Sequence, residues 1–158
     1  MCVATVDAWD LAVGGAGRTC MGYDLHITRK QRWSDVNGPG IALAEWIAVV
    51  AADRDMRLDG HAETRVGDGS ILRIENAGLS VWTAWSRHSE NAMAWFSFFH
   101  GNVVVKNPDL EIRRKMWTLA QALSAKVQGD DGEFYDAAGN QLQPGPQVPA
   151  ETPWWRFW

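Results

Sequence analysis

The chain of 158 residues is long enough for one hydrophobic core, and its composition, 46% hydrophobic and 22% charged, is typical of a globular domain. Its 15 Lys and Arg against 19 Asp and Glu give a formal net charge of -4. This charge argues against nucleic acid as the main partner, because phosphate binding requires a concentrated basic surface. No segment approaches the roughly 20 apolar residues of a membrane-spanning helix, so we expect no stable membrane association. The ten tryptophans predict a core built on indoles, an aromatic binding surface, or both.

Regular alternation of apolar and polar residues begins only after Met21. In this first pattern two sets of side chains alternate: Tyr23, Leu25 and Ile27 against Asp24, His26 and Thr28. The period of two predicts a strand over residues 23–29 with one buried and one solvated face. Residues 1–20 lack such a period and contain both cysteines, so we expect a disordered or non-native extension there and a domain that begins at Met21. A domain without cysteine fits a reducing, cytoplasmic location.

Two later segments have the period of an amphipathic helix. After a polar loop around Trp33, apolar side chains in "IALAEWIAVVAAD" recur at i, i+3, i+4 and i+7, namely Leu43, Trp46, Ile47 and Val50. The second helix follows Pro108 and Asp109, a typical helix start, and ends before Gly129. Its apolar stripe consists of Ile112, Met116, Leu119 and Leu123, with Ala120 and Val127 widening it.

Residues 57–106, between these helices, are predicted to form consecutive strands, which contain "ILRIE", "VWTAWS", "MAWFSFF" and "NVVVK". A short strand is also expected around residues 133–135. The order β-α-β-β-β-β-α-β predicts an α+β domain over residues 21–143, in which an antiparallel meander carries both helices on one face. Residues 144–158 are a Pro- and Trp-rich tail ending in "PWWRFW", which we expect to fold back onto an apolar groove of its own domain or of a partner.

Recognised catalytic motifs are absent from the sequence: there is no phosphate-binding glycine loop, zinc-protease helix, serine-hydrolase elbow or calcium loop. His26 shares the polar face of the first strand with Asp24, so this carboxylate could orient the imidazole as a general base. No two histidines have a coordinating spacing, so neither a metal nor a cofactor is predicted. His26 and Asp24 are therefore the candidate catalytic residues if the protein is an enzyme.

A second candidate surface combines acidic and aromatic residues. Trp82 and Trp85 are three positions apart on an expected strand, which would point them to opposite faces and leave one of them covered or exposed. Four acidic residues follow the second helix: Asp130, Asp131, Glu133 and Asp136. Acidic residues beside an exposed aromatic favour a basic protein partner, whereas the alternative interpretation is a solvated loop.

Several stretches also resemble a known group of proteins. "MGYDLHITR", the loop with Trp33, "LAEWIAVVAADRDMRL" and "LAQALSAKVQGDDGEFY" are similar to small, uncharacterised bacterial α/β proteins, some of which are encoded beside secreted polymorphic toxins and are taken to be immunity proteins. The resemblance covers most of residues 21–136 and starts with Met21, while residues 1–20 and the tail lie outside it. It implies a protein that blocks a toxin by covering its active site.

Two hypotheses follow from these observations. The first is an immunity-type protein that binds a basic toxin domain stoichiometrically and needs no catalytic residue. The second is a small hydrolase or metal-dependent enzyme that uses His26 and Asp24. A homodimer is compatible with either hypothesis.

Overall fold

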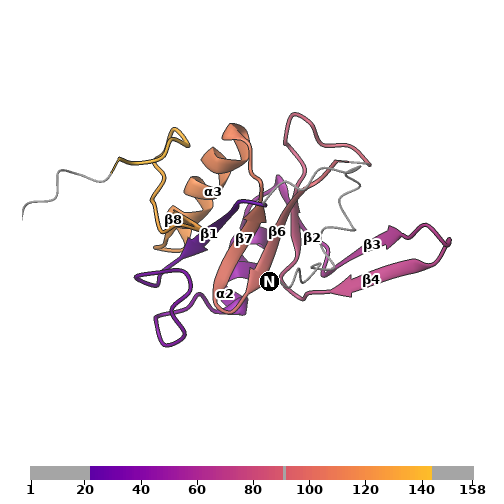
Figure 1. The fold of residues 1–158 in the computed structure, drawn as a ribbon, viewed down its shortest axis with the longest axis horizontal. Coiled ribbons are helices and arrows are strands. Elements are labelled where there is room, and N and C mark those ends of the chain that lie inside the picture. Colours follow the sequence, from indigo (N-terminus) through magenta and orange to yellow (C-terminus); the bar gives the residue numbers. More distant parts are fainter. Residues whose placement is uncertain (1–21, 91, 144–158) are drawn as a thin grey trace, which may run out of the picture.

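The computed structural model describes residues 22–90 and 92–143, and the predictions made for residues 1–20 and 144–158 lie outside this part of the chain. Figure 1 shows the order of the elements along the described chain. They are β1 (Asp24–Thr28), α2 (Leu43–Ala52), β2 (Met56–Leu58), β3 (His61–Arg65), β4 (Ile71–Glu75), β5 (Ser80–Trp82), β6 (Ala94–Phe99), β7 (Asn102–Lys106), α3 (Leu110–Ala122) and β8 (Lys126–Gly129). Neither α2 nor α3 is both long and apolar enough to cross a membrane.

Six of these strands form one sheet in the order β2-β5-β6-β7-β1-β8, in which all neighbouring strands run antiparallel. The predicted α+β class, with an antiparallel sheet and two helices, is confirmed. The chain has two more strands between its helices than predicted, because β2 has three residues and β3 (HAETR) has no run of apolar β-formers. Among the described strands, β3 pairs with β4 alone, and this hairpin extends away from the body in Figure 1.

Both helices pack on one face of the six-stranded sheet. Trp46 and Val50 of α2 are buried, and the Trp46 indole N–H donates to the Gly78 carbonyl oxygen at 2.7 Å. The predicted stripe of the second helix is buried, and Asp109 caps α3 by accepting from the Ile112 N–H at 2.9 Å. These helical side chains share one core cluster with alternate residues of the central strands: Leu25, Ile27, Ala94, Phe96, Val103 and Val105. The remaining alternate residues point to the helix-free face.

The prediction that the second helix continues to Gly129 is wrong, because α3 ends at Ala122 and Val127 lies on β8. The last strand is therefore β8, and the segment expected as a strand at residues 133–135 forms only isolated bridges.

The prediction that β1 has one solvated face is wrong. His26 and Thr28, which should lie on that face, are only 4% and 0% exposed. β1 is an inner strand between β7 and β8, and residues 29–40 fold back so that the Trp33 ring stacks on His26. A period of two identifies the two sides of a strand, but it does not show what covers each side.

Candidate functional site

The helix-free face of the sheet contains a groove of about 610 Å³. Strand register places its central residues side by side, since Val104 pairs with both His26 of β1 and Ser97 of β6. The groove wall combines aromatic rings with carboxylates and two basic side chains: Trp33, Trp85, Trp95, Phe99, Asp24, Asp109, Asp130, Arg87 and Lys106. A largely apolar wall with a few placed polar groups is typical of ligand and peptide sites.

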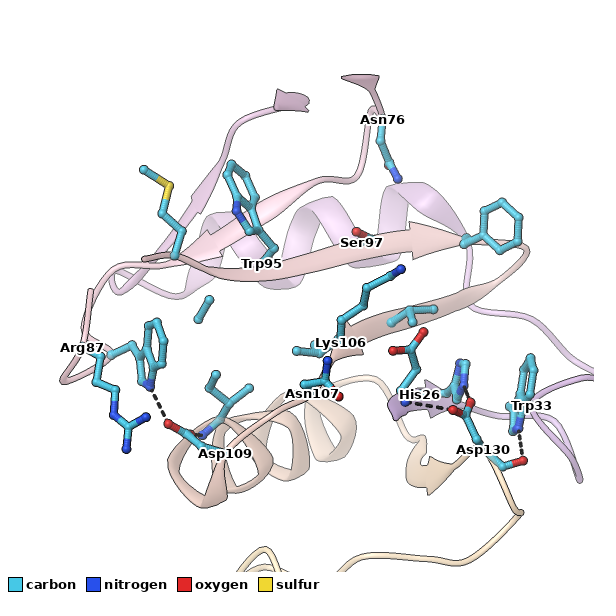
Figure 2. A pocket seen from close by; sticks show the side chains of 18 residues that line it. His26, Trp33, Asn76, Arg87, Trp95, Ser97, Lys106, Asn107, Asp109 and Asp130 are labelled. Atoms are coloured by element: carbon cyan, nitrogen blue, oxygen red, sulfur yellow. Dashed lines mark hydrogen bonds and ion pairs between the residues drawn. The ribbon is translucent and has the colours of Figure 1, made fainter. Parts of the chain in front are cut away.

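One end of the groove is formed by Trp33, His26 and Asp130, and we call it the Trp33 end (Figure 2). The ring centroids of His26 and Trp33 are 4.0 Å apart and their planes differ by 1°. Nε2 of His26 lies 3.0 Å from Oδ1 of Asp130. The Asp24 backbone N–H donates to the other carboxylate oxygen of Asp130 at 2.9 Å. The Asp130 carboxylate is therefore held in one orientation, with its side chain 33% exposed.

Trp33 is fixed by three hydrogen bonds although it lies in a loop. Its backbone N–H donates to Oε1 of Gln128 at 2.7 Å, and its carbonyl oxygen accepts from Nδ2 of Asn102 at 2.9 Å. Its indole N–H donates to the Asp130 carbonyl oxygen at 3.3 Å. Gln128 and Asn102 are themselves buried on β8 and β7. Contacts with two strands thus hold this part of the loop in place before any partner arrives.

The ring of His26 lines the groove but is almost fully buried. Nε2 is engaged by Asp130, and Nδ1 is buried without a hydrogen-bond partner. Asp24, the predicted orienting carboxylate, lies on the same strand face, but the carboxylate that contacts the imidazole is that of Asp130. The geometry suits a histidine that orients Asp130 and supports Trp33.

The opposite end of the groove lies at the start of α3. Asp109 accepts from the Trp85 indole N–H at 3.1 Å with one oxygen and caps α3 with the other. Figure 2 shows Arg87 and Asp109 together at this end, far along the groove from Trp33. Carboxylates therefore lie at both ends of the groove.

Trp82 and Trp85 do not lie on one regular strand, so the argument that they point to opposite faces is wrong. β5 ends at Trp82 and a turn begins at Thr83, whose N–H and hydroxyl donate to the Asp55 carbonyl oxygen at 2.8 and 2.9 Å. Both indoles are partly buried and pack against the core cluster. Of the two, only Trp85 lines the groove.

The four predicted acidic residues are divided among different roles. Asp130 lines the groove, whereas Asp131 is exposed to solvent. Oε1 of Glu133 accepts from the Tyr135 hydroxyl at 2.9 Å, and burial together with this carboxylate raises the pKa of Tyr135 to about 12. Asp136 closes a turn by accepting from the N–H groups of Ala138 and Asn140, both at 2.9 Å. These residues do not form a single acidic patch.

The sequence indicates only that Trp33 lies in a loop, and it does not identify Trp95, Lys106 or Asp109 as groove residues. The alternation of "NVVVK" places Val104 and Lys106 on one side of β7, but only the pairing of β7 with β1 shows that this side is the side of His26. Comparison with models of protein families, with curated proteins and with solved structures finds no match. Among the described residues, no group of three or more His, Cys, Asp and Glu is placed to hold a metal ion.

Proposed function

We propose that this protein is a cytoplasmic binding protein of the immunity type, which neutralises a basic toxin domain stoichiometrically through its helix-free face. The observation that carries the proposal is the preformed groove, in which Trp33 and Asp130 are both held by hydrogen bonds to strand residues. Rigid aromatic side chains are frequent hot spots of protein interfaces. Because they are already fixed, binding costs less conformational entropy.

The environment of His26 favours binding over catalysis. A general base must reach the proton that it abstracts with a free nitrogen, directly or through one water. In His26 one nitrogen is engaged by Asp130 and the other is enclosed. A positioning role for His26 uses the same contacts without requiring access to a substrate.

The charge of the chain supports a basic partner. The net charge is -4, and Asp130 lines the groove with its side chain 33% exposed. Negative charge at a contact surface accelerates association with a basic protein, and salt weakens the effect. This steering requires no catalytic residue.

A titration against the product of the neighbouring gene, assayed as a toxin, tests the proposal. The wild-type chain should inhibit the toxin until a fixed stoichiometry is reached. Val104→Trp, which fills the groove floor, should abolish inhibition, because Val104 lines the groove between His26 and Ser97. The matched control is Val36→Trp, the same substitution at a loop residue that is 91% exposed and lies outside the groove. It should inhibit like the wild type.

Two outcomes would contradict the proposal. Equal inhibition by Val104→Trp and Val36→Trp would mean that the groove is not the contact surface. Neutralisation of the toxin by trace amounts with turnover, abolished in a His26→Ala, Asp24→Ala variant, would instead support the enzymatic alternative. The melting temperature of each variant must be measured alongside, so that loss of inhibition is separated from loss of fold.

A further inference from the structure

We propose that the Trp33 end of the groove is a pocket for an arginine side chain of the partner polypeptide. This inference rests on the proposed function and specifies the group that the partner inserts. Three observations carry it: the charge balance along the groove, the orientation of Asp130, and the aromatic wall beside it.

The charge balance leaves a negative charge at the Trp33 end. Asp24 and Lys106 are paired residues of opposite charge on neighbouring strands, so their charges offset each other. At the far end, Asp109 lies at the positive N-terminus of α3 and near Arg87. The ion-pair partner of Asp130 that lies within the groove wall is His26, which carries a charge only when protonated. A cationic group of a bound partner would balance the charge of the Asp130 carboxylate at the Trp33 end.

The geometry of Asp130 suits a group with several donors. Each carboxylate oxygen accepts one bond, from the His26 ring or from the Asp24 N–H, and keeps a second lone pair. A guanidinium presents several N–H donors in one plane and can bond both oxygens at once. The ammonium of lysine is a compact and strongly hydrated charge, which gains less from a mainly apolar groove.

The aromatic wall provides a surface for the flat guanidinium. One face of the Trp33 ring is stacked on His26, and the indole is only partly buried. Arginine stacks on aromatic faces while its charge interacts with a nearby carboxylate. Because hydrogen bonds already fix Trp33 and Asp130, the pocket does not have to be ordered by the ligand.

The probe for the test is N-acetyl-arginine methylamide, added to the full chain labelled with ¹⁵N. Binding is followed through the indole N–H signal of Trp33, assigned by its loss in Trp33→Phe. The controls are the citrulline analogue, which has a similar shape without the charge, and the lysine analogue. We expect the arginine probe to bind at least about fivefold more tightly than either control, and more weakly as salt is raised.

Two neighbouring variants with the same change of charge locate the site. Asp130→Asn should reduce arginine binding to the level of citrulline, whereas Asp131→Asn should change the dissociation constant by less than about twofold. If Asp130→Asn lowers the melting temperature so far that it cannot be titrated, Val104→Trp provides the second test, because it fills the groove and should remove the shift of the Trp33 signal.

Failure of this inference is distinguishable from failure of the proposed function. Equal binding of the arginine and citrulline probes, or equal effects of Asp130→Asn and Asp131→Asn, would overturn the arginine pocket even if the groove still inhibits the toxin. Selective arginine binding without toxin inhibition would overturn the proposed function and leave the pocket standing. A Trp33 signal that does not move at any probe concentration would overturn the pocket outright.

Discussion

The two faces of the six-stranded sheet are built from the same strands but are covered in different ways. On the helix-covered face, α2 and α3 bury an apolar cluster that includes Leu25 and Met116. On the helix-free face, buried positions are occupied by His26, Asn102 and Gln128, each of which bonds to the loop around Trp33 or to its neighbour Asp130. Apolar contacts are non-directional, whereas these bonds fix one arrangement of side chains. The comparison indicates that the helix-covered face provides most of the stability, whereas the helix-free face provides a surface with fixed side-chain positions.

The strongest way to test this division is to open a cavity on the helix-covered face. Met116 is fully buried at the centre of α3. We expect Met116→Ala to lower the free energy of unfolding by about 2–5 kcal/mol, because the lost contacts leave a cavity that relaxes only in part. Arg114→Ala, on the exposed side of the same helix, should cost about 0.5 kcal/mol or less. Urea melts measure both, and similar values for the two variants would refute the assigned core face.

A smaller loss of unfolding free energy is expected on the helix-free face. There the substitution removes hydrogen bonds, whereas on the helix-covered face it removes apolar volume. Gln128 is 2% exposed, accepts from the Trp33 N–H and donates to the Gly132 carbonyl oxygen at 3.0 Å. Gln128→Met keeps the volume but leaves these groups unpaired, and we expect it to cost about 1–3 kcal/mol. The exposed Gln121→Met is the matched control and should be near neutral.

The indole N–H signal of Trp33 provides a second measurement for Gln128→Met. If Gln128 holds the loop, the indole N–H signal of Trp33 should move or broaden in Gln128→Met and stay in place in Gln121→Met. An unchanged Trp33 signal in both variants would mean that the loop is held without Gln128.

The helix-covered face could be predicted from the sequence because its pattern is local. The stripe of α3 requires only the helical period, and its four predicted residues are all buried. The hairpin between β6 and β7 also has a local signal, because Gly101 stands between two runs of β-forming residues. His100 and Gly101 take the positive φ angles, 47° and 76°, that its tight turn requires.

The groove could not be predicted because its contacts are far apart along the chain. His26 and Asp130 are candidates from the sequence under two different hypotheses, catalysis and partner binding. The bond between them joins residues 104 positions apart. Trp33 was known only as a loop residue, and its contacts with Gln128 and Asp130 span 95 and 97 positions. Periodicity contains no information on such pairings, which depend on strand order and register.

A pH titration tests the contribution of one polar group, the Tyr135 phenol, to the stability of the helix-covered face. Tyr135 belongs to the core cluster, and its pKa is raised from 10.0 to about 12 by burial first and by the hydrogen bond to Glu133 second. Between these values the unfolded chain has lost the phenol proton while the folded chain keeps it. The free energy of unfolding should therefore fall by up to about 1.4 kcal/mol per pH unit over this range.

Tyr135→Phe isolates this contribution. The stability advantage of the wild type over this variant should be complete below pH 10 and should shrink as the pH rises toward 12. Urea melts of both proteins at several pH values measure the difference. A constant difference across the range would show that Tyr135 titrates alike in the folded and unfolded chains.

The smallest change in unfolding free energy is expected in the loop after β8, which contains the acidic residues Asp131 and Asp136. Asp131 is exposed and makes no hydrogen bond to another described residue through its side chain, so Asp131→Lys should change the free energy of unfolding by less than about 0.5 kcal/mol. Asp136→Ala removes the acceptor of two backbone N–H groups and should cost about 1 kcal/mol. Urea melts of these two variants distinguish the residues. A large loss in Asp131→Lys would mean that the charge of Asp131 supports the fold, and Asp131 could then no longer serve as the neutral control for Asp130 in the arginine titration.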